Sequence, residues 1–204
     1  MAKWRRPRDV RAGQGQIGPN AILQLLPVLE QAGGRRFRDQ VMAMAGVFAP
    51  PSDQGMMPEG PAARMHQALR TLEPEMAPSL AWEAGVRTAY YIMAHRIPSP
   101  AQTVLKALPS ALAAPLLSKA IAKHAWTFAG SGRFAREGAL RFAIVDNPIV
   151  RGEVSEVPLC HWHRAVFETL FRTLVDARLR CQETECCATG HDACRFALAR
   201  NLSF

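Results

Sequence analysis

A chain of 204 residues that is 49% apolar and 21% charged has the composition of a water-soluble globular protein, and it can bury a core without disulfide bonds. Its longest apolar stretch, ALPSALAAPLLSKAIA (107–122), is interrupted by prolines, serines and a lysine, which argues against a membrane-spanning helix. The basic N-terminus lacks the apolar segment of a secretory signal, so we expect a cytoplasmic protein whose cysteines are reduced.

The net charge of +8 is unevenly distributed, because MAKWRRPRDVRAGQG (1–15) carries Lys3, Arg5, Arg6, Arg8 and Arg11 against a single acidic residue. We expect residues 1–15 to form a flexible basic arm and residues 16–204 to form one domain. Such an arm either contacts an anionic membrane surface or is a solvated tail. No aromatic-rich basic motif of a nucleic-acid-binding module follows it, so nucleic acid is not an expected partner.

Two glycine motifs resemble nucleotide-binding turns. GQGQIG (13–18) has the G-x-G-x-x-G spacing, but the basic arm stands where a strand is required, and no acidic residue ends a second strand about twenty residues later. GSG (130–132) lacks the Lys-Ser/Thr pair of a phosphate loop. We therefore expect no nucleotide-binding fold.

Helical signals come first along the chain and strand signals follow. Asn20 is a candidate N-cap, Pro27 should kink or split the first helix, and Gly33-Gly34 should end it. Residues 46–61 are rich in proline and glycine and indicate a loop. Apolar periodicity and helix-ending residues predict helices at 21–34, 36–46, 62–76, 79–97, 100–108, 110–125 and 158–179, the last beginning at Pro158.

The strand signals lie near the C-terminus. EGALRFAIVDNP (137–148) alternates and ends in turn residues, which predicts a strand. Two further short strands, LRCQETEC (179–186) and CRFALAR (194–200), enclose a turn at residues 189–192. Helices followed by strands, without β-α-β alternation, predict an α+β fold in which N-terminal helices pack on a small antiparallel sheet.

The segment CQETECCATGHDACRF (181–196) contains four of the five cysteines, and the fifth is Cys160 at the start of the last helix. Cys186 and Cys194 flank the turn, and Glu183 lies three residues before Cys186. With Cys160, these residues would suit a closed, structural tetrahedral Zn²⁺ site near the C-terminus, and amides at the helix start would favour the thiolate. Strand alternation places Glu183 and Cys186 on opposite faces, so the strand must bulge or end between them. The alternative is that the cysteines are small buried apolar residues.

The motif ETECCATGHDACRF, with Cys160 ahead of it, resembles the signature of the vinyl-4-reductase domain family. In relatives that sense phenols, a cysteine, a glutamate and two cysteines at this spacing bind zinc beside a ligand pocket. The resemblance implies Cys160, Glu183, Cys186 and Cys194 as zinc ligands, with Cys181 and Cys187 as core or surface thiols. It also implies an α+β fold similar to that of eukaryotic transport-particle subunits, and a homodimer.

Three further segments, GQIGPNAILQLLPVLEQAGG, HRIPSPAQTVLKALP and SKAIAKHAWTFAGSGRF, resemble the bacteriochlorophyll 4-vinyl reductases of photosynthetic bacteria. This resemblance implies a vinyl-bearing magnesium tetrapyrrole, such as divinyl protochlorophyllide or Mg-protoporphyrin, as ligand or substrate. It also implies enzymes of bacteriochlorophyll biosynthesis as partners. With this function, the charge of the basic arm predicts peripheral contact with the photosynthetic membrane. Candidate ligand-binding residues are Trp126, Phe128 and Phe134 for the ring, and His95 or His124 for the magnesium.

Three functions are consistent with these residues. The favoured one is a carrier or accessory protein that binds the tetrapyrrole intermediate. The second is a 4-vinyl (8-vinyl) reductase, which requires an external electron donor because the sequence shows no redox-cofactor motif. The third is a small-molecule sensor module like the phenol-responsive relatives. The sequence names no catalytic residue.

Overall fold

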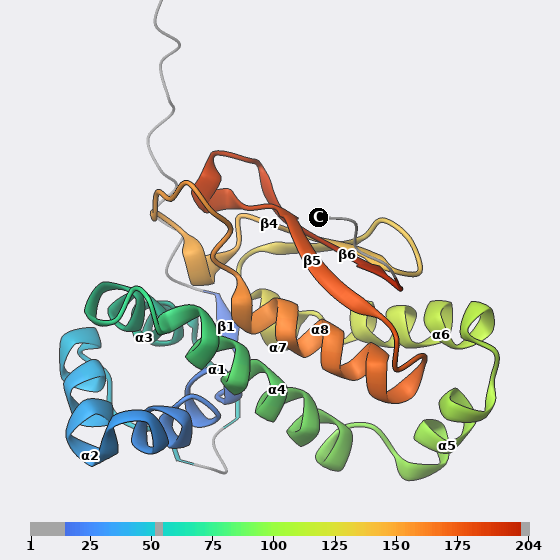
Figure 1. Cartoon of the computed structure of the whole chain (residues 1–204), viewed down its shortest axis with the longest axis horizontal. Helices are drawn as coiled ribbons and strands as arrows, with labels where there is room; N and C mark the ends of the chain where they lie inside the picture. The colour runs from blue at the N-terminus through green and yellow to red at the C-terminus, as the bar shows by residue number, and fades with distance from the viewer. Residues whose placement is uncertain (1–14, 52–54, 201–204) are drawn as a thin grey trace, which may run out of the picture.

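The structure is a computed structural model that describes residues 15–51 and 55–200 (Figure 1). The predicted basic arm therefore lies outside the described residues, except for Gly15. Within the described part, helices precede the main sheet, as the sequence predicts. The helices are α1 (Asn20–Leu23), α2 (Leu26–Ala45), α3 (Glu59–Leu72), α4 (Ala77–His95), α5 (Ser99–Ala107), α6 (Ser110–Lys123), α7 (Trp126–Ala129) and α8 (His161–Leu174).

Several helix boundaries differ from the sequence prediction for local reasons. The first predicted helix is split, because α1 ends before Pro27 and the proline occupies an early position of α2. Asn20 is the first residue of α1 and not its cap, and its side chain accepts a hydrogen bond from Gln24. Gly33 and Gly34 have non-helical backbone angles inside α2, so this range consists of two helices joined at a kink, and the predicted stop at the glycine pair is confirmed.

The main sheet is antiparallel throughout, with strand order β3-β4-β6-β5. Its strands are β3 (Arg133–Arg136), β4 (Arg141–Val145), β5 (Arg180–Glu185) and β6 (Ala193–Ala199). The single strand predicted at 137–148 is therefore wrong in extent, because residues 137–140 form the turn of a β3–β4 hairpin. A separate two-stranded pair, β1 (Gln16–Ile17) and β2 (Met57–Pro58), joins the start of the described chain to α3, and residue pairs 16–58 and 17–57 face each other.

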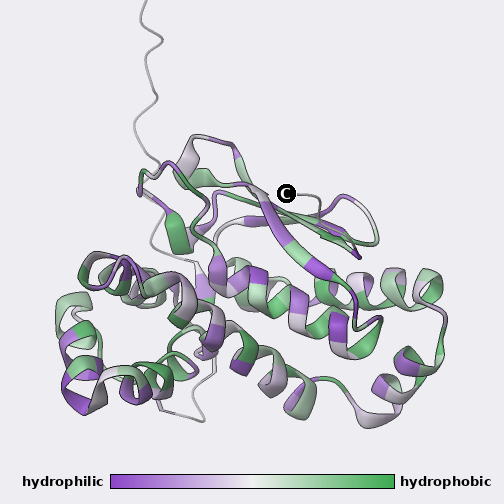
Figure 2. Ribbon diagram, in the orientation of Figure 1, coloured by the Kyte–Doolittle hydropathy of each residue, from purple (hydrophilic) through white to green (hydrophobic). Residues whose placement is uncertain are grey.

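Helix α8 is the central element, lying between the sheet and α4 (Figure 1). Its green and purple residues alternate along the axis, as expected of an amphipathic helix (Figure 2). Phe167 of α8 packs on Phe142 and Phe196 of the sheet, with ring centroids 5.0 and 5.2 Å apart. On the α4 side, a Cβ on Gly85 would collide with the Trp162 carbonyl oxygen, so glycine permits the close approach of the two helices.

One glycine from each of the two glycine motifs leaves room for a buried carboxylate. Glu59, at the start of α3, is 1% exposed and accepts hydrogen bonds from the Ser131 amide at 2.6 Å, the Ser131 hydroxyl at 2.7 Å and Arg151 Nη1 at 2.7 Å. A Cβ on Gly15 or Gly130 would collide with Glu59 Oε2. At Gly130 the vacant side-chain position leaves room for Glu59.

Candidate functional site

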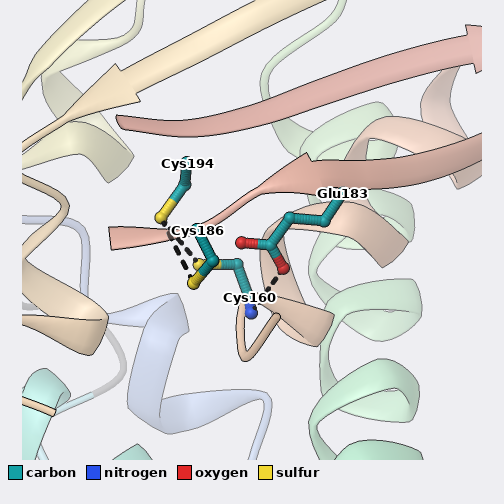
Figure 3. A group of neighbouring side chains, drawn as sticks. All are labelled: Cys160, Glu183, Cys186 and Cys194. Atoms are coloured by element: carbon teal, nitrogen blue, oxygen red, sulfur yellow. Dashed lines mark hydrogen bonds between the residues drawn. The ribbon is translucent and has the colours of Figure 1, made fainter. Parts of the chain in front are cut away.

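The four residues predicted as metal ligands converge at the N-terminus of α8 (Figure 3). The predicted ligand set is Cys160, Glu183, Cys186 and Cys194, and one ligand atom from each lies within 4.8 Å of the others. All four side chains are buried. Residues that are 34 positions apart in the sequence are thus brought to one point by α8, β5 and β6.

Cys160 is the N-cap of α8, so the helix begins at His161 and not at the predicted Pro158. The Cys160 carbonyl accepts the first helical hydrogen bond from Arg164 at 3.0 Å. Its amide donates to Glu183 Oε2 at 2.8 Å. The start of the helix and the position of the Glu183 carboxylate are therefore fixed by the same residue.

The predicted bulge between Glu183 and Cys186 is present. The β5–β6 register shifts between Glu183 and Glu185, and β5 ends immediately before Cys186. The shift places both side chains on the same side of the turn, which regular alternation would prevent. The turn itself continues through a short 3₁₀ segment, η3 (Cys187–Thr189), and Gly190 in the left-handed conformation.

The spacing of the Cys186 and Cys194 sulfur atoms is that of two ligands on one tetrahedral ion. Cys194 Sγ lies 3.3 Å from Cys160 Sγ and 3.8 Å from Cys186 Sγ. Sulfur atoms bound to one tetrahedral zinc at ~2.3 Å are about 3.8 Å apart. Glu183 Oε1 is buried and has no hydrogen-bond partner among the described residues, and it points toward the sulfur atoms in Figure 3. A buried carboxylate oxygen without a partner is costly unless a cation or proton occupies the space.

Burial opposes ionisation of two members of the cluster, Glu183 and Cys160, when no cation is bound. Burial raises the pKa of Glu183 to about 8 and raises the pKa of the Cys160 thiol. The expectation that amides at the helix start favour the Cys160 thiolate concerns the metal-bound site, and it stays a prediction. Hydrogen bonds from Cys160 and Cys194 lower the pKa of Cys186. A divalent cation would displace the remaining protons, since metal ligands must be deprotonated.

Two supporting groups around the sulfur atoms were not predicted. Asn147 is buried, and its side-chain amide donates to Cys160 Sγ at 3.2 Å. The Cys187 amide donates to Cys194 Sγ at 3.4 Å. Such donors orient metal-bound sulfur and delocalise its charge. The Asn147-Pro148 pair was identified only as a turn; the short 3₁₀ segment that follows, η2 (Pro148–Val150), carries Asn147 to the cluster.

The two cysteines outside the predicted ligand set lie as core and surface thiols, as predicted. Cys181 is fully buried in β5, and burial raises the pKa of its thiol. Cys187 is half-buried, and a hydrogen bond with Cys194 lowers the pKa of its thiol to about 7. A cavity of about 520 Å³ lies beside Cys187, lined by residues 146–147, 150–155 and 187–192. Its charged lining does not suit a flat apolar ring.

The predicted tetrapyrrole-binding residues are distributed over three regions. Phe128 and Phe134 are half-buried and pack edge to face, with ring centroids 5.3 Å apart, next to Phe167. Trp126 is 58% exposed at the start of α7.

The two predicted magnesium ligands lie on different helices. His124 is exposed at the C-terminal end of α6. His95 is exposed at the end of α4, where its ring lies 4.5 Å from Tyr91. The contacts and burial of the two residues do not test whether either histidine ligates magnesium, and both assignments stay predictions.

A buried histidine that the sequence did not single out lies closer to the aromatic residues. His163 is 1% exposed, with its ring 6.2 Å from Phe128 and 4.7 Å from Trp162. Its Nδ1 has no hydrogen-bond partner among the described residues. Burial lowers the pKa of His163 to about 4, so the imidazole is neutral at physiological pH. Only its position on the amphipathic helix, three residues after Cys160, could have indicated burial.

Comparison with known proteins supports the predicted resemblance. The vinyl-4-reductase domain family matches residues 140–200, which hold β4, α8 and the β5–β6 hairpin. The bacteriochlorophyll synthase 23 kDa chain of Cereibacter sphaeroides is 53% identical over 185 residues, covering 90% of both chains. The protein of the same name from Rhodobacter capsulatus is 49% identical, covering 90% of this chain and 86% of that one.

Solved structures of low sequence identity share the fold. An Fe(II) unliganded H-NOX protein mutant from K. algicida superposes with a TM-score of 0.53 and 11% identity, covering 91% of this chain and 97% of the other. A second H-NOX structure, from work on heme distortion, superposes with a TM-score of 0.53 and 10% identity, covering 92% and 97%. At these identities the likeness concerns the fold alone.

Proposed function

The chain belongs to the vinyl-4-reductase domain family that includes the bacteriochlorophyll synthase 23 kDa chains, and from this premise we propose that it binds a vinyl-bearing magnesium tetrapyrrole intermediate of bacteriochlorophyll biosynthesis. In this role it holds or delivers the pigment as a carrier or accessory protein for the biosynthetic enzymes. The observation that carries the proposal is the 53% identity over 90% of the chain to a protein named as a chain of bacteriochlorophyll synthase.

The aromatic residues at the α7–β3 junction support this function. A tetrapyrrole ring is planar and largely apolar, so its site needs aromatic or aliphatic surface with few polar groups to fix orientation. Phe128 and Phe134 present such surface while half-buried, and Trp126 offers an indole ring that is 58% exposed before any ligand binds. In this proposal Trp126 stacks on the ring and His124, two residues earlier, approaches the magnesium.

The proposal assigns Cys160, Glu183, Cys186 and Cys194 to a Zn²⁺ that stabilises the β5–β6 hairpin against α8. Four buried donors with the observed sulfur spacing and an unpartnered carboxylate oxygen support it. Bound there, zinc would supply a cross-link and no redox chemistry, because all four positions of a tetrahedral ion would be filled by protein. The ring-binding residues are different ones, so pigment binding and zinc binding can be tested separately.

The test is titration of zinc-loaded, full-length protein with Mg-protoporphyrin, followed by absorption spectroscopy. We expect micromolar or tighter binding, and Trp126→Ala should weaken it by about 1–3 kcal/mol, the range for aromatic stacking on a planar base. Tyr90→Ala is the matched control, because Tyr90 is 57% exposed on α4. Absence of binding to the wild-type protein would contradict the proposal.

Two further measurements refine the assignment. If His124 ligates the magnesium, His124→Ala should weaken binding of Mg-protoporphyrin more than binding of metal-free protoporphyrin; the same comparison applies to His95→Ala. Anaerobic incubation with divinyl protochlorophyllide and candidate electron donors separates binding from reduction. Loss of the vinyl group in that mixture would replace the carrier function with the reductase function.

A further inference from the structure

We propose that the exposed face of α6, together with Trp126, docks the protein onto an anionic lipid surface. This inference concerns a structured surface distinct from the N-terminal basic arm. It does not depend on pigment binding. Helix α6 lies at the end of the molecule opposite α2 and α3 (Figure 1), where neighbouring elements leave one of its sides uncovered.

The two sides of α6 differ sharply in burial. Ala113, Leu117 and Ile121 are buried against the body of the protein. On the other side, Leu112 is 56% exposed and Leu116 is 51% exposed. Lys119 and Lys123 are exposed too, and with the two leucines they follow the spacing of one helical face. We call these four residues, Leu112, Leu116, Lys119 and Lys123, the α6 face.

Helix α6 and the sequence segments on either side of it carry charge of a single sign. Residues 84–136 contain no aspartate or glutamate. The same stretch holds seven basic residues: Arg87, Arg96, Lys106, Lys119, Lys123, Arg133 and Arg136. Among the described residues, the ion pairs are formed by other cations, such as Arg70, Arg151 and Arg195. The lysines of the α6 face are therefore available to an external anion.

Exposed leucines beside these lysines match the chemistry of a peripheral lipid contact. Interfacial helices place leucine and aromatic side chains in the headgroup region while lysines contact anionic lipids. Trp126 begins α7 three residues after the end of α6, and indole prefers the membrane–water interface. No helix in the described part of the chain is long and apolar enough to cross a membrane, so the contact inferred here is superficial.

The experiment is co-sedimentation of zinc-loaded, full-length protein with vesicles of mixed phosphatidylcholine and phosphatidylglycerol, and with pure phosphatidylcholine vesicles as reference. We expect binding to the anionic vesicles that weakens with added salt. Leu112→Ser with Leu116→Ser, and separately Lys119→Glu with Lys123→Glu, should each weaken that binding about tenfold or more. Trp126 fluorescence should shift to shorter wavelength on binding, and Trp126→Phe should remove that change.

Matched variants separate this face from general attraction by the net charge of +8. Arg35→Glu with Arg36→Glu makes the same charge change on exposed residues of α2, and Val154→Ser with Val157→Ser removes exposed apolar groups from a loop. Both should bind vesicles nearly as the wild type does. The proposal fails if the α6 variants bind as well as these controls. It also fails if only deletion of residues 2–12 abolishes binding, because the basic arm would then make the contact. Absence of binding of folded wild-type protein to either kind of vesicle would contradict it as well.

Discussion

The carboxylate of Glu59 ties together segments that are far apart in the sequence. Its hydrogen bonds reach the turn that contains Ser131 and the loop that begins at Arg151, while its backbone amide donates to the Gly15 carbonyl at 2.9 Å. A buried carboxylate is stable only when its oxygens are satisfied, and here an arginine and two donors from one serine satisfy them. The fold therefore requires glycine at the positions that lie against the Glu59 carboxylate.

Substitution of Gly130 should test that requirement. Gly130→Ala should lower the free energy of unfolding by about 2–3 kcal/mol, because the added Cβ collides with Glu59 Oε2 and because φ at this residue is +59°. Gly138→Ala, in the β3–β4 turn, is the control, since a Cβ there meets only Arg141 Cβ at 3.9 Å. Urea denaturation measures the free energy of unfolding of both variants. Equal stability of the two variants would show that the Glu59 carboxylate relocates without cost.

The β5–β6 hairpin shows how much of the site could be predicted from sequence. Cysteine and glutamate spacing indicated that the strand must bulge or end between Glu183 and Cys186, and the family resemblance implied the four candidate ligands. The structure has the register shift and brings the four side chains together. Donors such as Asn147 could not be found this way, because a turn residue acquires its role only when η2 carries it to Cys160. Local spacing identifies ligands, whereas long-range packing selects the groups that surround them.

The same division applies to the secondary structure. The order of helices and strands followed from periodicity and from proline and glycine positions. Strand β3 was missed because RFAR (133–136) is short and has arginine at both ends, so pairing with β4 creates the strand more than local preference does. The start of α8 was placed too early because the Cys160 amide bonds to Glu183, a tertiary contact that no local rule anticipates.

Removal of a single sulfur donor should weaken the whole hairpin. Cys186→Ser should reduce bound zinc from about one per chain and lower the melting temperature, because the binding energy of a structural metal is also folding energy. Cys187→Ser is the adjacent control: the Cys187 side chain is outside the candidate ligand set and half-buried. Zinc content by atomic emission and thermal unfolding are measured together. A Cys186→Ser protein with wild-type zinc and stability would remove Cys186 from the site.

Two histidines are buried in the interior of the protein, and this makes the stability of the whole molecule depend on pH. His66 of α3 and His163 of α8 are each 1% exposed. Burial is the largest cause that lowers the pKa of His66 to about 3, and the positive charge of Arg70 adds to it. His66 Nε2 lies 3.2 Å from the Ala21 carbonyl oxygen, so the neutral ring can donate a hydrogen bond there without a second charge partner.

The sign of the pH effect follows from these pKa values. The unfolded chain protonates His66 near pH 6.5, while the folded protein stays neutral there until about pH 3, so the unfolded state binds more protons and stability falls as pH falls between those values. Between pH 8 and pH 5, His66 should remove about 2 kcal/mol from the free energy of unfolding. His66→Gln keeps an amide donor toward Ala21 but cannot titrate. Urea unfolding measures the free energy of unfolding of both proteins at pH 8 and pH 5, and the pH 8 values account for any packing change in the variant. The variant should lose less of this free energy between the two pH values. Equal losses would mean that His66 is protonated in the folded protein.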